Sequence, residues 1–204
     1  MRKKFFSRFP DGSSRNWQDW RWQLRRRATS LPALTRILET PPRGGKPLER
    51  LISRYPMAVT PYYLSLLNPD DENDPLSVQC VPDFRELSFS AGLTDDPLGE
   101  DLSMPVPNLI QRYPDRVLAI VTHRCATYCR HCNRKRFWSV PEAGSLKSRL
   151  APMVRFVSET PRVREVILSG GDPLMFDDAS LEMILSSFAS IPHVEVLRIG
   201  SRAP

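Results

Sequence analysis

The sequence lacks any long apolar run. Hydrophobic residues make up 41% of its 204 residues, yet no stretch approaches the roughly 18–20 apolar residues that a membrane-spanning helix needs. The basic N-terminal segment 1–9 has no apolar core of about 7–15 residues, which a secretory signal would have. We therefore expect a soluble cytoplasmic protein without a membrane partner.

Cysteine is scarce but clustered. Three of the four cysteines stand at Cys125, Cys129 and Cys132, a Cx₃Cx₂C spacing. In the cytoplasm such a cluster indicates metal ligands rather than disulfides. Three thiolates on one loop suit a [4Fe–4S] cluster with one open iron. Zinc is the alternative, with His131 or Cys80 as the fourth ligand, although the second CxxC pair that is usual in structural zinc sites is missing.

Charge is unevenly distributed. The net charge is +6, and residues 1–30 hold nine Arg or Lys against Asp11 and Asp19, a local balance of 9 − 2 = +7. A nucleic-acid-binding arm is one interpretation. The interleaved Trp17, Trp20 and Trp22 favour a solvated helix face or a subunit contact instead. We expect no nucleic-acid partner.

No alternating strand pattern occurs before about residue 115, which predicts a helical N-terminal region over residues 1–90. Trp17, Trp20, Leu24 and Ala28 follow helical spacing and predict one helix that starts at Ser13. Ser30 is the expected cap of a second helix. We expect further helical segments over residues 47–54, 61–67 and 82–87, a chain break at 41–45 and a turn at 68–75.

Residues 91–116 are rich in Pro and Asp and have little periodicity. Such a stretch is typical of a linker or of an ordered functional loop. We expect it to separate the helical region from the domain formed by residues 117–204.

Residues 117–204 alternate between strand and helix patterns. Apolar runs at 117–121, 165–168 and 194–199 predict strands, and residues 146–157 and 181–188 have helical spacing, the latter capped by Asp177 or Asp178. This order predicts an α/β fold with parallel strands and right-handed crossovers. Three strands are few for a complete sheet, so we expect the chain to be the front part of a longer protein or a truncated product.

Each predicted strand is followed by a polar or glycine-rich loop. The cysteines follow the first strand, residues 169–173 the second, and residues 200–202 the third. Ligands bind at this edge of parallel sheets. Gly170 and Gly171 allow a close approach of the backbone to a ligand, and Asp172 can accept a hydrogen bond from an ammonium or hydroxyl group. A plain strand-to-helix turn would also explain this loop.

Basic residues surround the cysteines at Arg130, Arg134, Lys135 and Arg136. Surface charge is the usual explanation, but one guanidinium here can bind a carboxylate bidentately. Arg112, Tyr113 and Arg116 can likewise meet an anion such as a phosphate. His193, in the turn before the third strand, is expected to be structural.

Several further segments carry a resemblance that runs from about residue 13 to the end of the chain. They are residues 17–23, 58–65, 105–107, 112–117, 128–132, 169–172, 191–194 and 198–202. With the Cx₃Cx₂C motif, they resemble the lysine 2,3-aminomutase family of radical S-adenosylmethionine enzymes, in its N-terminal portion. The resemblance implies the first three β/α units of a partial (β/α)₆ barrel, truncated, over residues 117–204.

The resemblance also implies a reaction. S-adenosylmethionine on the open iron would be cleaved to a 5′-deoxyadenosyl radical, which acts on an amino acid held as an aldimine on pyridoxal 5′-phosphate, and the amino group moves from C2 to C3. The enzyme would be an isomerase, an intramolecular aminotransferase. Its partners would be a small amino acid and a reductant for the cluster, and the full-length form would be a homo-oligomer.

Site residues follow from the same resemblance. Cys125, Cys129 and Cys132 would be the cluster ligands, and Arg134 would bind the substrate carboxylate. The cofactor-binding positions implied for S-adenosylmethionine are His131, Ser169, Gly170, Gly171 and Asp172, and those for pyridoxal phosphate are Arg112 and Tyr113. No protein acid or base is implied within the chain.

Asn133 and Lys135 depart from the residues usual in the family, which are Thr and Arg. The family's pyridoxal-binding lysine and its distal substrate contacts would lie beyond residue 204, so we expect the isolated chain to be almost inactive. Alternatives are a glutamate or arginine 2,3-aminomutase, a relative acting on protein lysine, or a zinc-binding basic protein associated with nucleic acid.

Overall fold

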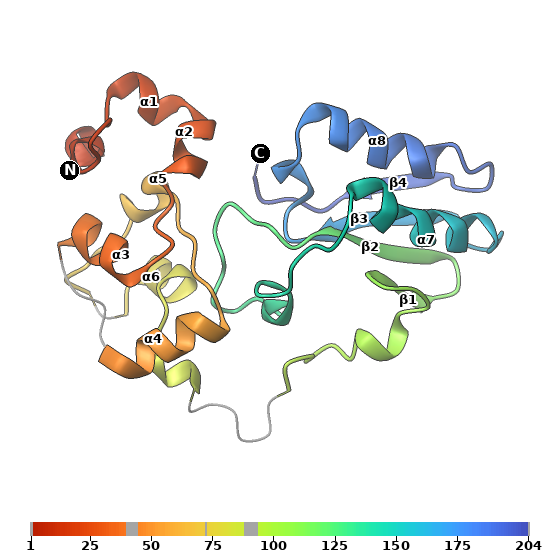
Figure 1. Cartoon of the computed structure of the whole chain (residues 1–204), viewed down its shortest axis with the longest axis horizontal. Coiled ribbons are helices and arrows are strands. Elements are labelled where there is room, and N and C mark those ends of the chain that lie inside the picture. Colours follow the sequence, from red (N-terminus) through yellow and green to blue (C-terminus); the bar gives the residue numbers. More distant parts are fainter. Residues whose placement is uncertain (1, 40–44, 72, 88–93, 204) are drawn as a thin grey trace. The chain divides into compact units, whose positions relative to one another are not determined.

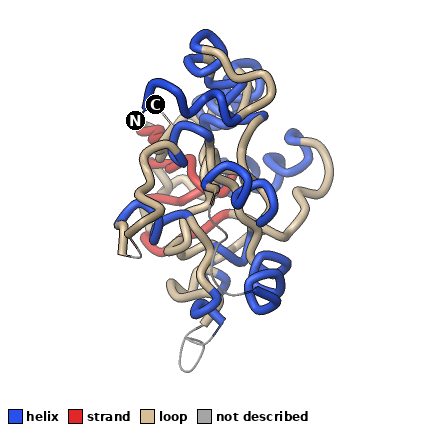
Figure 2. The backbone as a smooth tube through the Cα atoms, turned by 90° about the vertical axis from the view of Figure 1, so that its left-hand side faces the viewer, coloured by secondary structure: helices blue, strands red, loops and turns tan. Residues whose placement is uncertain are grey.

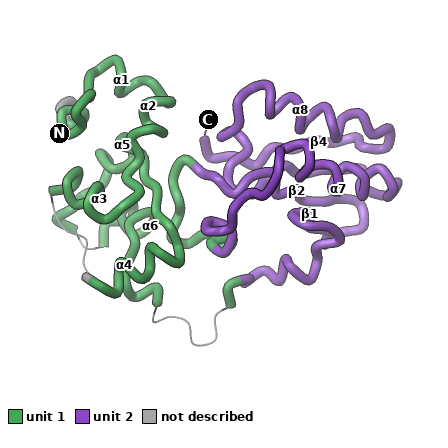
Figure 3. Tube along the Cα trace, viewed as in Figure 1, with its two compact units in different colours: residues 1–95, 126–135 green, residues 96–125, 136–204 purple. Residues whose placement is uncertain are grey.

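The chain forms two compact units. The computed structural model describes residues 2–39, 45–71, 73–87 and 94–203. One unit comprises residues 1–95 and 126–135, and the other comprises residues 96–125 and 136–204 (Figure 3). The chain therefore leaves the second unit just after Cys125, contributes ten residues to the first unit and returns.

The first unit is helical. Its 3-10 turns are η1 (Arg2–Arg8) and η2 (Phe84–Leu87), and its helices are α1 (Ser14–Gln18), α2 (Trp20–Arg25), α3 (Leu31–Leu38), α4 (Gly45–Arg54), α5 (Pro61–Leu64) and α6 (Pro75–Cys80). Ser30 caps α3 by accepting a hydrogen bond from the backbone N–H of Ala33, as the sequence predicts. Within its described residues this unit contains no strand, and a single backbone bridge joins Ala28 to Val59.

The predicted helix from Ser13 through Ala28 is wrong. Asp19 adopts an extended conformation (φ −83°, ψ 110°), ends α1, and caps α2 through its own side chain. This break changes the helical phase. Trp22, which lay off the predicted apolar stripe, is therefore 2% exposed, whereas Trp20 on that stripe is 55% exposed. The indole N–H of Trp22 donates to Asp11 at 3.0 Å.

Two other helical predictions change. Helix α6 was not predicted; Asp74 caps it, and it begins with Pro75, which suits the first turn of a helix. Helix α5 ends at Leu64, earlier than expected. The predicted break at 41–45 lies almost entirely outside the described residues.

The second unit contains a four-stranded sheet in the order β1 (Leu109–Tyr113), β2 (Arg116–Thr122), β3 (Glu165–Gly170) and β4 (Val196–Ile199). Figure 2, with strands in red, shows them gathered in one sheet. Strands β2, β3 and β4 are parallel, as predicted. Helices α7 (Leu146–Ser158) and α8 (Asp178–Ala189) are the predicted crossovers, and Asp177 caps α8.

Strand β1 corrects the expectation that residues 91–116 form a loop or linker. This stretch contains a 3-10 turn, η3 (Asp101–Ser103), and then β1, which pairs antiparallel with β2. Only Leu109 and Ile110 of β1 are buried, so the strand has no alternating pattern to recognise. Pro114 and Asp115 form the turn to β2, and proline suits the second position of such turns.

The core of the second unit lies between the sheet and its helices. Helix α7 contacts β2, α8 contacts β4, and the two helices contact each other (Figure 1). The largest buried side chains between them include Leu109, Met153, Leu168, Ile184 and Phe188. The unit is therefore α/β, with a helix layer on a mixed sheet. In neither unit does a described helix have the length and apolarity needed to cross a membrane.

Candidate functional site

The loop after β3 packs directly against the residues that lead into Cys125. Gly171 N–H donates to the carbonyl of Thr122 at 2.6 Å, and Asp172 N–H donates to that of Arg124 at 2.8 Å. A Cβ at Gly171 would lie 2.2 Å from the Arg124 carbonyl oxygen. A Cβ at Gly170 would lie 2.3 Å from that of Thr122, and Gly170 has φ +122°. Both glycines are therefore required by contact between two backbone segments.

Asp172 ties this loop to the one after β4. The residue is 6% exposed, and its carboxylate accepts three hydrogen bonds. They come from the backbone N–H of Leu174 at 3.0 Å, the hydroxyl of Ser201 at 2.7 Å and the backbone N–H of Arg202 at 2.8 Å. A carboxylate offers about four acceptor positions. Asp172 therefore has a structural role, which the sequence did not reveal, and little acceptor capacity beyond it.

The predicted convergence of the three loops is confirmed in the second unit. The residues before Cys125 contact the β3 loop, and the β3 loop contacts the β4 loop. Ser169 is partly buried at the end of β3, where it pairs with Ile120. The carboxyl ends of the parallel strands thus form one polar edge of the sheet.

Glu142 fixes the end of β2 and was missed by the sequence reasoning. It accepts hydrogen bonds from the Thr122 hydroxyl at 2.6 Å and the His123 backbone N–H at 2.5 Å, and it forms an ion pair with Arg149 at 2.7 Å. Burial alone would raise the pKa of Glu142, but these hydrogen bonds and the Arg149 charge hold it below its usual range. The imidazole of His123 stacks on Phe137, with 4.9 Å between ring centroids.

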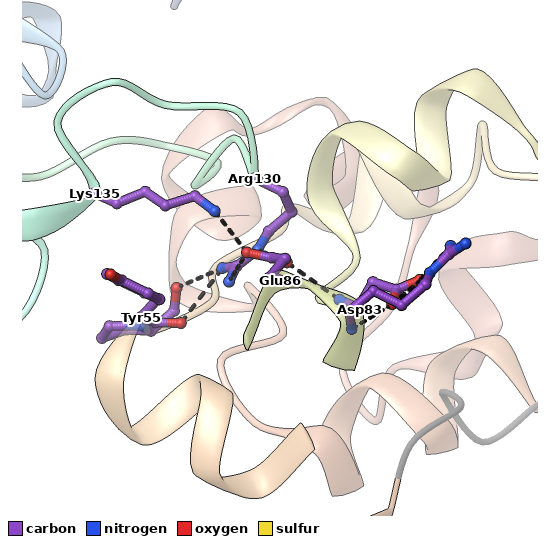
Figure 4. A network of polar contacts seen from close by, with 7 residues as sticks. Tyr55, Asp83, Glu86, Arg130 and Lys135 are labelled. Carbon is purple, nitrogen blue, oxygen red and sulfur yellow. Dashed lines mark hydrogen bonds and ion pairs between the residues drawn. The ribbon is translucent and has the colours of Figure 1, made fainter. Parts of the chain in front are cut away.

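The middle of the cysteine loop belongs to the first unit. The backbone N–H of Tyr128 donates to Ala58 O at 2.9 Å, and that of Arg130 donates to Gln79 O at 2.7 Å. The Arg130 side chain, expected to be surface charge or a ligand for a carboxylate, is buried and ion-paired with Glu86 (Figure 4).

Arg136 also has internal partners. In the second unit its guanidinium lies 3.3 Å from Asp96, 3.3 Å from Glu100 and 3.0 Å from Asp101. Within the predicted basic cluster, Arg130 and Arg136 thus neutralise acidic groups of their own units. Arg134 is partly buried and His131 is exposed, both in the first unit.

The chain has the thiols that an iron–sulfur cluster requires. All four cysteines are described, and none forms a disulfide. Cys125, Cys129 and Cys132 are partly exposed, and the Cys132 sulfur accepts the Arg134 backbone N–H at 3.3 Å. Burial raises the pKa of Cys132. By donor type and spacing, these three residues fit a [4Fe–4S] cluster.

Cys125 belongs to the second unit, and Cys129 and Cys132 belong to the first. Over the described ranges, no three His, Cys, Asp or Glu side chains are gathered as a metal site. The metal assignment of the three cysteines therefore stays a prediction that rests on their spacing.

Cys80 does not suit the role of a fourth ligand. It is 1% exposed, and its thiol lies 3.4 Å from the carbonyl oxygen of Leu76. Burial, and secondarily the nearby Cys129, raise the pKa of Cys80 to about 12. Metal ligation requires the thiolate, so a buried, protonated Cys80 weakens the zinc alternative.

Arg112 and Tyr113 lie away from the polar edge of the second unit. They are on β1, and Tyr113 pairs with Arg116 at the start of β2. Because β2 runs from Arg116 to Thr122 at about 3.3 Å per residue, Tyr113 lies at the opposite end of the sheet from residues 169–172. The Arg116 guanidinium is 5.5 Å from the centre of the Tyr113 ring. Thus the structure does not bring these predicted residues together.

His193 has the structural role predicted for it. Its Nε2 atom lies 2.9 Å from the carbonyl oxygen of Val157, near the end of α7. The contact joins the turn before β4 to the preceding crossover helix.

Fold and site together define an α/β protein with a Cx₃Cx₂C loop at the carboxyl end of a parallel strand. No family model matches the sequence, but curated proteins do. Over all 204 residues the chain is 42% identical to L-lysine 2,3-aminomutase of Clostridium subterminale, covering 49% of that protein. It is 40% identical over 194 residues to the enzyme of the same name from Bacillus subtilis, covering 95% of the chain and 41% of that protein.

A third relative is named for a different substrate. Glutamate 2,3-aminomutase of Clostridioides difficile is 34% identical over 192 residues, which cover 94% of the chain and 45% of that protein. The chain spans about half the length of the curated relatives it matches. The chain is thus similar over nearly its whole length to lysine 2,3-aminomutases, of which it matches about half.

Proposed function

We propose that this chain is part of a radical S-adenosylmethionine amino acid 2,3-aminomutase, an isomerase that moves an amino group from C2 to C3. The observation that carries the proposal is the 42% identity to a lysine 2,3-aminomutase over the whole chain, the cysteine loop included. We propose that residues 117–204 contribute to a partial (β/α)₆ barrel. The parallel strands β2, β3 and β4 with their crossover helices support this.

Three cysteines would hold the cluster: Cys125, Cys129 and Cys132. When bound, the cluster, S-adenosylmethionine and pyridoxal phosphate supply the one-electron and carbonyl chemistry, whereas the protein binds, orients and shields. His131 and the loop 169–172 would contact S-adenosylmethionine. Because the Asp172 carboxylate already accepts three hydrogen bonds, this loop would use Ser169 and its backbone carbonyl groups.

Arg134 would bind the substrate carboxylate. A guanidinium offers a planar pair of donors that matches both carboxylate oxygens. The resemblance implies that Arg112 and Tyr113 contact pyridoxal phosphate, but their place at the opposite end of the sheet from residues 169–172 does not support that role. Because the relatives are about twice as long as this chain, we propose that the 204 residues by themselves show little aminomutase activity. The amino acid and a reductant would be the partners, and the full-length protein would be a homo-oligomer.

Iron loading tests the proposal. After anaerobic reconstitution with iron and sulfide, the chain should be brown and bind about four irons. Cys129→Ala should abolish iron binding, because only two of the three thiolates that hold the cluster would remain. Cys80→Ala is the matched control and should bind as much iron as the wild type, because Cys80 is a buried thiol outside the ligand set. A colourless wild-type protein that retains one zinc would overturn the proposal.

The substrate has two candidates. Lysine is favoured by the identity of 42% to a lysine 2,3-aminomutase, and glutamate by the 34% identity to a glutamate 2,3-aminomutase. Assays of the longer parent protein with each amino acid, with the β-amino product quantified by mass spectrometry, decide between them.

A further inference from the structure

One carboxylate in the first unit contacts two cations of the cysteine loop. Glu86, on η2, accepts from Arg130 Nε at 2.9 Å and Nη2 at 3.0 Å, and from Lys135 Nζ at 2.6 Å. Arg130 Nη1 also donates to the carbonyl of Pro56 at 3.0 Å. Figure 4 shows the Arg130 and Lys135 side chains meeting at Glu86. We call Glu86, Arg130 and Lys135 the anchor network.

The anchor network is more shielded from solvent than an ordinary surface ion pair, with Arg130 buried and its two partners partly buried. The Arg130 side chain is 4% exposed, that of Glu86 15% and that of Lys135 21%. Exposed pairs contribute little to stability, whereas removing one partner of a buried pair is strongly destabilising because it leaves the other charge buried and uncompensated. Burial alone would raise the pKa of Glu86, but hydrogen bonds from Arg130 and Lys135 hold it below its usual range. Glu86 is therefore ionised at neutral pH.

Two members of the anchor network lie close to the cysteines in the sequence. Arg130 directly follows Cys129, and Lys135 comes three residues after Cys132. Glu86 thus joins both ends of the segment 130–135. The backbone N–H groups of Tyr128 and Arg130 donate to the carbonyls of Ala58 and Gln79, which restrains the backbone on both sides of Cys129.

We propose that Glu86 and Arg130 are positioning residues that hold Cys129 and Cys132 in the arrangement required by the cluster. The inference rests on the proposed function, in which these thiols bind iron. Neither residue touches the cluster in this role. They act through the backbone of the loop, as groups around metal ligands commonly do.

The test compares two carboxylates of the same segment. Glu86→Gln removes the charge at nearly constant size. Asp83→Asn is the matched control, because the Asp83 side chain pairs with Arg85, whose side chain is 65% exposed, and the substitution keeps the backbone N–H that Asp83 donates to Glu86 at 3.2 Å. In the reconstituted chain, the rate of iron loss to a chelator should rise about 10–100-fold in Glu86→Gln and stay at the wild-type rate in Asp83→Asn. Equal rates in Glu86→Gln and the wild type would overturn the proposal.

A second readout does not need the cluster. In the metal-free chain, alkylation of each cysteine by iodoacetamide is followed by mass spectrometry. Glu86→Gln should speed alkylation of Cys129 and Cys132 relative to Asp83→Asn, because the loop is released. Unchanged alkylation contradicts positioning even if the wild type binds no iron, whereas a wild type without iron contradicts the proposed function itself.

A third variant distinguishes iron loss caused by a displaced loop from iron loss caused by a destabilised fold. Glu86→Met combined with Arg130→Met replaces this pair by apolar side chains of similar length and removes both charges together, so that only Lys135, whose side chain is 21% exposed, loses its carboxylate partner. It should unfold at a temperature close to that of the wild type and still lose iron faster. If its iron-loss rate returns to the wild-type value along with its stability, the pair stabilises the fold only and the proposal fails.

Discussion

Asp172 provides the sharpest test of how the polar edge of the second unit is built. One carboxylate oxygen accepts the Leu174 N–H and the Ser201 hydroxyl, and the other accepts the Arg202 N–H. At about 1 kcal/mol net per hydrogen bond, Asp172→Ala should destabilise the unit by about 3 kcal/mol. Asp172→Asn can keep two of the three bonds, because its amide oxygen replaces one carboxylate oxygen, and should cost about 1 kcal/mol.

Amide hydrogen exchange measures the loss of stability locally, so the two units can be followed separately. Since about 1.4 kcal/mol corresponds to a tenfold change, Asp172→Ala should speed exchange in β3 and β4 on the order of 100-fold, and Asp172→Asn only about fivefold. Peptides from α3, in the first unit, are the internal control and should not change. Exchange at the wild-type rate in Asp172→Ala would refute the structural role and leave Asp172 available for a ligand.

Two further predictions concern the same unit. Gly171→Ala should be less stable than the wild type by about 1–3 kcal/mol, because its Cβ would meet the Arg124 carbonyl oxygen at 2.2 Å. It should therefore unfold at a lower urea concentration, and an unchanged midpoint would contradict this contact. The pKa of Glu142 is lowered on folding from an ordinary value of 4.5, so its stabilising effect is complete above that value and is lost as the pH falls through the lowered pKa. Between pH 5 and pH 3 the stability of Glu142→Gln should thus fall less steeply than that of the wild type, as followed by urea titration; parallel curves would exclude the effect.

The sequence predicted local features well. Helix caps depend on side chains within three residues, so Ser30 could be identified directly and the cap of α8 could be narrowed to Asp177 or Asp178. The strands β2 and β3 are largely buried, and their apolar runs are visible without any tertiary information. The spacing of the three cysteines is likewise a property of the sequence.

The predictions from the sequence were wrong for short or half-exposed elements. Strand β1 has only two buried residues and carries no periodic signal. The phase of the N-terminal helices depended on Asp19, whose extended backbone separates α1 from α2 and brings Trp22 instead of Trp20 into the core. A single capping residue therefore overrode a regular apolar stripe.

Residue patterns were enough to predict parallel strands and a Cx₃Cx₂C loop after the first of them. What surrounds that loop depends on contacts between residues far apart in the sequence. Arg130 pairs with Glu86, which is 44 residues away in the sequence, and Asp172 accepts a hydrogen bond from Ser201, which is 29 residues away. Gly170 and Gly171 are needed because another backbone segment packs against them. Long-range packing of the chain determines these contacts, so they cannot be predicted from a local pattern of residues.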